Sequence, residues 1–193
     1  MTRARAAAGS LLFLLVAPGV AAGLVPWLLT GWDSTDPPMA AKLLGGVLIV
    51  AGASVLVSAF ARFVVEGIGT PAPVAPPSQL VVGGLYRYVR NPMYLAVTTT
   101  IVGQALQLGR PVLLVYAALF MAVVAAFVYG YEQPTLARRF GAAYDDYCRN
   151  VPAWLPRLRP WTPSAASAAA SAESRGSPAV PSDRTSSRER RAP

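Results

Sequence analysis

Four long stretches of this sequence contain no charged residue, and they constrain the fold more than any other feature. They are residues 6–32, 43–61, 91–109 and 111–131. At about 1.5 Å of helix rise per residue, each is long enough to cross a hydrocarbon layer about 30 Å thick. The chain has 193 residues, of which only 13% are charged, whereas a soluble domain has about 25%. The sequence therefore predicts an all-α integral membrane protein.

We expect about four transmembrane helices. Their expected bounds are residues 11–29, 42–65, 94–108 and 112–129. Only residues 109–111 separate the last two, so these helices should form an antiparallel hairpin. Pro18 and Pro26 would kink the first helix, which a bilayer tolerates where neighbouring helices bond the freed backbone groups. A cleaved signal peptide is the alternative for the first stretch, but its apolar run is too long for one.

The second expected span carries small residues along its whole length. They are Gly45, Gly46, Gly52, Ala53 and Ser58. Small residues let the backbones of two membrane helices approach closely, so this span should pack tightly against a neighbour.

The distribution of Lys and Arg predicts the orientation of the chain. With the N-terminus inside, the outer side holds only Lys42 and Arg110 near the ends of the spans. The cytoplasmic side holds Arg3, Arg5, Arg62, Arg87, Arg90, Arg138 and Arg139. By the positive-inside rule, both termini should be cytoplasmic.

Composition excludes several classes of function. The net charge of +8 is not gathered into a basic stripe with interleaved aromatics, so nucleic acid is not an expected partner. The chain has no histidine and one cysteine, which argues against a metal site, a histidine base and an internal disulfide. Few polar residues lie within the spans, which argues against an ion pathway. Sixteen arginines against one lysine favour a GC-rich bacterial source.

The expected domain covers residues 1–161, and residues 162–193 should be a disordered tail. Within the domain, the proline-rich start of the loop 66–93 should be extended. The segment 131–161 has apolar residues at near-helical spacing and should lie at the membrane interface, broken near Gly141. The tail is almost entirely Ser, Ala, Pro and Arg, so it cannot build a core.

Some residues are assigned structural roles from their type and position alone. Trp27, Trp32, Trp154 and Trp161 are expected to be interface anchors, and Cys148 a small packing residue.

The start of the third span is unusually rich in functional side chains. Residues 83–94 read Gly-Gly-Leu-Tyr-Arg-Tyr-Val-Arg-Asn-Pro-Met-Tyr. One interpretation is an interfacial anchor of aromatic and basic residues. The other is an anion site, because Pro92 opens a helix whose free N–H groups lie near arginines.

Glu132 follows twenty-one charge-free residues at the end of the fourth span. A carboxylate at that depth is costly unless it is paired. Its partner is either Arg87 or Arg90 across the hairpin, in a structural ion pair, or a bound cation. In the second case the two sites together could hold a zwitterion such as S-adenosylmethionine.

These motifs resemble those of the isoprenylcysteine carboxyl methyltransferase family and the related phospholipid methyltransferases. The resemblance covers about residues 62–156 and rests on the segments 78–94, 132–136 and 139–152. It implies a small membrane enzyme that uses S-adenosylmethionine, with a site formed by the cytoplasmic loop and the C-terminal amphipathic segment. It also implies cofactor contacts at Ser78, Gln79, Leu80, Val81, Tyr86, Arg90, Asn91, Pro92, Met93, Tyr94 and Glu132.

Three positions depart from the family pattern. Asn91 stands where the family has His, Gln133 where it has a second Glu, and Val128 where the eukaryotic enzymes carry a substrate-binding Arg. These departures argue against histidine base chemistry and against a prenylcysteine carboxylate as substrate. Tyr144 and Tyr147 either close over the cofactor or pack against the membrane surface.

The sequence therefore predicts methyl transfer to a lipid or other hydrophobic acceptor at the cytoplasmic face, with no catalytic residue assigned. One alternative is a membrane reductase of the sterol-reductase type that uses NADPH. The other is a catalytically inactive scaffold, which Asn91 and Gln133 favour.

Overall fold

The computed structural model describes residues 16–65, 80 and 82–162, and this part of the chain contains helices but no β-strand. The elements in chain order are the π-helix η1 (Val20–Leu24), α2 (Val25–Thr30), α3 (Met39–Val65), the 3-10 helix η2 (Gly84–Arg87), α4 (Pro92–Leu108), α5 (Val112–Phe127), the π-helix η3 (Val128–Glu132), α6 (Gln133–Phe140) and α7 (Ala142–Asn150). The all-helical prediction is confirmed for these residues. The expected tail lies outside them, apart from Thr162.

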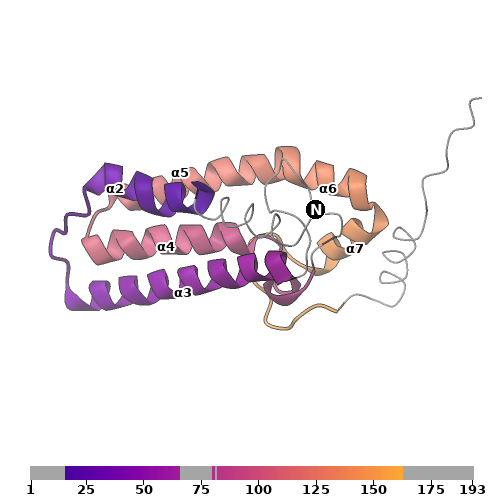
Figure 1. Ribbon diagram of the computed structural model, residues 1–193, viewed down its shortest axis with the longest axis horizontal. Helices are drawn as coiled ribbons and strands as arrows, with labels where there is room; N and C mark the ends of the chain where they lie inside the picture. Colours follow the sequence, from indigo (N-terminus) through magenta and orange to yellow (C-terminus); the bar gives the residue numbers. More distant parts are fainter. Residues whose placement is uncertain (1–15, 66–79, 81, 163–193) are drawn as a thin grey trace, which may run out of the picture.

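The long helices α3, α4 and α5 run side by side along the molecule, with α4 packed against both of the others (Figure 1). The predicted hairpin is present, because α4 ends at Leu108 and α5 begins at Val112. Gly109 makes the turn with φ +65°, a left-handed conformation that glycine adopts without strain. Gly141 divides α6 from α7, as the sequence indicated.

Two helical segments of the described chain are long and apolar enough to cross a membrane, Met39–Arg62 and Val112–Phe140. Only 22% of each apolar window is buried inside the chain, whereas the core helix of a soluble protein would be mostly covered. The exposed positions are large aliphatic residues such as Val50 at 66% and Val115 at 69%. Such faces are suited to lipid and not to water.

Close contact between α3 and α4 depends on glycine. A Cβ atom on Gly103 would lie 2.7 Å from the carbonyl oxygen of Gly45 and 2.9 Å from the backbone nitrogen of Ile49. A Cβ on Gly52 would lie 2.7 Å from the carbonyl oxygen of Ala96. The tight packing predicted from the small residues of this span is confirmed at Gly45 and Gly52.

The first apolar helix, Val16–Thr30, widens into the π-turn η1 just before Pro26. The Val25 N–H bonds to the Val20 carbonyl, five residues back. Pro26 has no N–H to donate, and its ring crowds the carbonyl four residues back. The widened turn therefore accommodates the proline without ending the helix.

Side chains of the neighbouring helices bond the carbonyls that this turn leaves free. The Tyr116 hydroxyl donates to the Ala21 carbonyl at 2.8 Å. The Gln104 Nε2 donates to the Ala22 carbonyl at 2.7 Å. The expectation that neighbouring helices bond the backbone groups freed near a proline is confirmed at Pro26.

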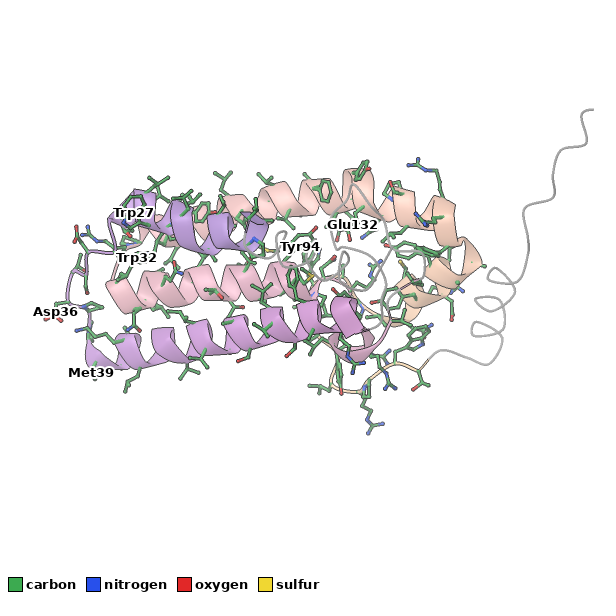
Figure 2. All side chains as sticks on the ribbon, viewed as in Figure 1. Trp27, Trp32, Asp36, Met39, Tyr94 and Glu132 are labelled. Carbon is green, nitrogen blue, oxygen red and sulfur yellow. The ribbon has the colours of Figure 1, made fainter. Side chains whose placement is uncertain are left out.

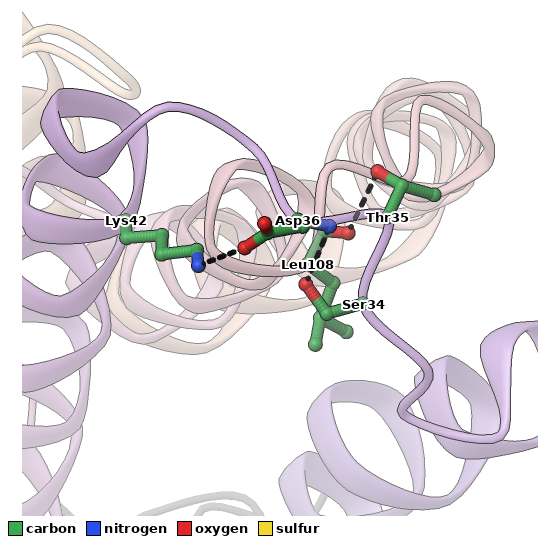
Figure 3. A network of polar contacts seen from close by, with 5 residues as sticks. All are labelled: Ser34, Thr35, Asp36, Lys42 and Leu108. Atoms are coloured by element: carbon green, nitrogen blue, oxygen red, sulfur yellow. Dashed lines mark hydrogen bonds and ion pairs between the residues drawn. The ribbon is translucent and has the colours of Figure 1, made fainter.

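A polar network joins the two loops at the end where α2, α3 and the α4–α5 turn meet (Figure 3). Thr35 donates its N–H to the Leu108 carbonyl at 2.9 Å. Beside it, Asp36 pairs with Lys42 at 2.5 Å and donates its N–H to the Ser34 hydroxyl at 3.1 Å. The hydrogen bond and charge of Lys42 lower the pKa of the Asp36 carboxyl.

Candidate functional site

The candidate site lies at the opposite end, where α4 begins and α6 and α7 follow η3 (Figure 1). The irregular segment 151–162 is bonded there to the residues that precede α4. The backbone N–H groups of Arg90, Arg157 and Trp161 donate to the carbonyls of Pro152, Tyr88 and Arg87 respectively, each at 3.0 Å. These bonds hold the C-terminal segment against the motif that opens α4.

Tyr94 and Glu132 meet across the helices (Figure 2). The Tyr94 hydroxyl, in the first turn of α4, donates to Glu132 Oε2 at 3.1 Å. Glu132 is the last residue of η3 and is partly buried. In the described part of the chain, no Lys or Arg nitrogen lies within 4.0 Å of its carboxylate. Among the described residues, the carboxylate therefore has a neutral partner and no counter-charge.

The interpretation of Glu132 as one half of a structural ion pair with Arg87 or Arg90 is wrong, because both arginines have other partners. Arg87 donates from Nε to the Trp161 carbonyl at 2.6 Å. Arg90 donates from Nη1 to the Cys148 sulfur at 2.5 Å. These acceptors come from α7 and the segment after it, which the sequence does not place beside the arginines. The Nε atom of Arg90 is buried and has no partner.

Asn91 and Tyr86 hold the C-terminal region in place. Asn91 is buried before the first residue of α4, and its Nδ2 donates to the Ala153 carbonyl at 3.1 Å. The Tyr86 carbonyl accepts the Tyr147 hydroxyl at 2.7 Å. These hydrogen bonds run to the segment 151–162 and to α7, and not to Glu132.

For the other predicted cofactor contacts, the structure gives only burial or packing. Pro92 is buried at the start of α4, and Met93 beside it is partly buried. Leu80 packs against the aromatic cluster described next. Ser78, Gln79 and Val81 lie outside the described residues.

An aromatic cluster closes this end of the protein. Tyr144, Tyr147, Val151 and Trp161 are buried together. Burial raises the pKa of both tyrosine hydroxyls, so they remain protonated at neutral pH. Trp161 is 8% exposed, with its ring 5.6 Å from that of Tyr147. The prediction of an interface anchor at Trp161 is therefore wrong, because the folded C-terminal segment turns this residue inward.

The π-helix η3 is a feature of the site that the sequence analysis missed. The Gln133 N–H bonds to the Val128 carbonyl, five residues back, and Pro134 follows. The widened turn ends at Glu132. Gln133 also carries a buried Nε2 atom without a partner. A proline two residues after a charged group at the end of a membrane helix is the signal that could have indicated this turn.

The family comparison decides what kind of protein carries this arrangement. A family model described as phospholipid methyltransferase matches residues 40–143, which is just over half of the chain. The chain belongs to the phospholipid methyltransferase family. No curated protein and no solved structure matches it significantly.

The part matched by the phospholipid methyltransferase model extends from the start of α3 to the start of α7. It includes Tyr94, Glu132 and Pro134, and it ends before the residues that bond Arg87 and Arg90. Membership confirms the resemblance inferred from the sequence. It identifies the chain as a membrane methyltransferase by family.

Proposed function

We propose that this protein transfers a methyl group from S-adenosylmethionine to a lipid or other hydrophobic acceptor at the cytoplasmic face of the membrane. The observation that most supports this is the contact between Tyr94 and Glu132, at 3.1 Å, within the segment that matches the family. It sets an uncompensated carboxylate beside the motif that opens α4.

The residues at this end have the chemistry that the cofactor requires. S-adenosylmethionine carries an ammonium, a carboxylate and a sulfonium. Glu132 can compensate a positive group, since in the described chain it has no cationic partner. The buried, unpartnered Nε of Arg90 can donate to a negative group. The proposed contacts are Ser78, Gln79, Leu80, Val81, Tyr86, Arg90, Asn91, Pro92, Met93, Tyr94 and Glu132.

The bound cofactor would supply an activated methyl group, so the protein's task is to align the acceptor and exclude water. Tyr94 fixes the orientation of the Glu132 carboxylate through its hydroxyl. Asn91 is held by Ala153 and cannot titrate, so its role is to keep the loop in place. No described residue is assigned as a general base. We therefore propose an acceptor atom that reaches the site already unprotonated.

We also propose that α4 and the helix Val16–Thr30 complete a four-span topology with both termini cytoplasmic. α4 has 17 residues and packs between two helices whose outer faces suit lipid. Lys42 and Arg110 lie at the end opposite the site, and Arg87, Arg90, Arg138 and Arg139 at the site end. Under the positive-inside rule, this asymmetry supports a cytoplasmic location for the site end.

Calorimetry on the detergent-purified protein tests the proposal. We expect saturable binding of S-adenosylhomocysteine and none of NADPH. Binding of NADPH alone would favour the sterol-reductase-like alternative, and binding of neither would favour an inactive scaffold. Transfer of label from methyl-labelled S-adenosylmethionine into an organic extract of membranes that contain the protein would then identify the acceptor class.

A further inference from the structure

A cavity of about 330 Å³ lies between the last turns of α3 and the 3-10 helix η2. It is lined from α3 by Ser58, Ala59 and Arg62, and from the other side by residues 84–88. The helix α4 lies between α3 and α5 (Figure 1), and Glu132 ends the turn that follows α5. The cavity therefore belongs to the α3 side of the molecule, whereas the Glu132 carboxylate belongs to the α5 side.

The lining of this cavity is basic. Its described residues include two arginines, Arg62 and Arg87, and no Asp or Glu. Arg87 is held by two neutral acceptors, the Trp161 carbonyl at 2.6 Å and the Thr162 hydroxyl at 2.8 Å. Within the described chain, no carboxylate oxygen lies within 4.0 Å of this guanidinium. Its position is thus fixed by groups that do not neutralise its charge.

Gly84 allows the other arginine to approach the same wall. A Cβ atom on Gly84 would lie 2.8 Å from the Nε of Arg62 and 3.4 Å from its Cζ. The Arg62 guanidinium therefore lies directly against the backbone of η2. Gly84 also has φ +57°, which residues with a side chain rarely adopt. The glycine thus brings the charge at the end of α3 to the segment that carries Arg87.

The cavity lies where the apolar surface of α3 ends. The apolar segment Met39–Arg62 ends at an arginine of the lining. Val47 lies eleven positions before Ser58, which is about three helical turns, so the two residues share a face of α3. Val47 is 64% exposed, and such a face suits acyl chains. A ligand at this place can therefore have an anionic end between the arginines and an apolar end along α3.

We propose that this cavity binds the phosphate group of an anionic phospholipid from the surrounding bilayer, with Arg62 and Arg87 as the groups that hold it. Arginine bonds phosphate oxygens through paired N–H groups, and basic pockets between membrane helices recognise anionic lipid head groups. This lipid is distinct from the methyl acceptor, and the inference does not rest on the proposed function. Since Arg87 also bonds Trp161 and Thr162, the bound lipid joins the membrane surface to the C-terminal segment.

Native mass spectrometry of the delipidated protein in detergent tests this site. The probes are phosphatidylglycerol and phosphatidylcholine with the same acyl chains, and inorganic phosphate serves as a competitor. We expect one phosphatidylglycerol to bind at least about 5-fold more tightly than phosphatidylcholine, because only the first carries a net negative charge.

Variants then assign the binding to the cavity. Arg62→Gln should weaken phosphatidylglycerol binding about 5- to 10-fold, and Arg62→Lys, which keeps the charge, should recover part of the loss. The matched control is Arg138→Gln. It removes an exposed arginine of α6 at the same end of the molecule but outside the cavity, and it should leave the affinity unchanged. The thermal midpoint of each variant checks that it is folded.

Equal affinity for the two lipids would overturn the inference, as would equal losses in Arg62→Gln and Arg138→Gln, because both results indicate unspecific attraction to a basic surface. Displacement of the lipid by inorganic phosphate at equal concentration would overturn the lipid as the occupant in favour of a soluble phosphate. Tyr86, a proposed cofactor contact, also lines the cavity. Displacement by S-adenosylhomocysteine would therefore assign the cavity to the cofactor site and overturn the inference. Specific lipid binding without any binding of S-adenosylhomocysteine would support this inference and overturn the proposed function.

Discussion

The two π-turns of this protein share a cause but differ in what surrounds them. Each widens an apolar helix and ends two residues before a proline, with Pro26 after η1 and Pro134 after η3. At η1, Tyr116 and Gln104 bond the freed carbonyls. At η3, the last residue is Glu132, whose carboxylate has no Lys or Arg within 4.0 Å in the described chain, and the next residue, Gln133, has a buried Nε2 atom with no partner there. At η1, neighbouring side chains bond the freed carbonyls, and we call it the closed turn. At η3, polar groups have no such partner among the described residues, and we call it the open turn.

We therefore interpret η1 as a structural adaptation to its proline and η3 as a candidate binding feature. A buried polar group without a partner costs about 1–3 kcal/mol, so a turn with no task should have its polar groups bonded by neighbours, as η1 has. The open turn lies in the segment that matches the family, whereas η1 precedes it. We therefore expect changes at η3 to alter affinity and changes around η1 to alter stability.

The largest expected effect comes from the carboxylate beside the open turn. Glu132→Gln keeps the shape of the side chain but removes its charge. A hydrogen bond to a charged group contributes about 1.5–3 kcal/mol, so the Kd for S-adenosylhomocysteine should rise about 10- to 100-fold in calorimetry. The matched control is Asp36→Asn at the opposite end, which should leave the Kd unchanged. Equal affinity of Glu132→Gln and the wild type would remove Glu132 from the site.

The closed turn should respond in stability and not in affinity. Tyr116→Phe leaves the Ala21 carbonyl without a donor, and membrane hydrogen bonds of this kind are worth about 0.6–1.7 kcal/mol. We expect a lower thermal midpoint in detergent and an unchanged Kd. Tyr131→Phe is the control, since its ring is 49% exposed. A loss of affinity in Tyr116→Phe at full stability would contradict the division between the two turns.

Gln104→Leu should destabilise less than Tyr116→Phe. It frees the Ala22 carbonyl, but it also removes the Gln104 Oε1 atom, which is itself buried without a partner. The two changes partly offset each other, so the thermal midpoint should lie between those of the wild type and Tyr116→Phe. A midpoint below that of Tyr116→Phe would show that the Gln104 contact is the stronger one.

Replacing the proline after each turn by alanine compares the roles of the two turns directly. Pro134→Ala supplies an N–H that lets η3 revert to a regular α-helix and so displaces Glu132, and the Kd for S-adenosylhomocysteine should therefore rise about 5- to 10-fold, or about 1 kcal/mol. Pro26→Ala makes the same change at η1 and should leave the Kd within about two-fold, as its carbonyls already have donors. The same response from both variants would show that the turns do not differ in role.

The smallest expected effect is the pH dependence of the loop network at the far end. The folded-state pKa of Asp36 lies below its ordinary value because Lys42 bonds it. Its contribution to stability is therefore complete above the ordinary carboxyl pKa and is lost as the pH falls through the lowered folded value. Asp36→Asn should remove this acid-range component from the thermal midpoint measured against pH, and it should not change ligand binding.

The parts of this molecule that the sequence predicted are those decided by local pattern. The charge-free runs predicted the apolar helices, residues 109–111 the hairpin turn, and Gly141 the break between α6 and α7. The contact between Glu132 and the motif that opens α4 was predicted from the hairpin. The short link between α4 and α5 places the start of α4 beside the segment that follows α5.

The features that the sequence did not predict depend on contacts between distant segments. The partners of Arg87 and Arg90 lie 58 or more residues away, in α7 and in the irregular segment that follows it. The burial of Trp161 has the same origin. The π-turns were missed for another reason, because a proline predicts a disturbed helix but not whether the helix bends, ends or widens.

The bonds from residues 151–162 to the motif before α4 also bear on how the protein is made. The backbone N–H of Arg90, the side chain of Asn91 and the carbonyl of Tyr86 all bond to residues from Tyr147 onward. During synthesis the membrane helices can insert and pair well before those residues emerge from the ribosome. The end of the molecule that carries Glu132 would then stay unfinished until translation passes Trp161, so a nascent chain would be inserted before it could bind its ligand.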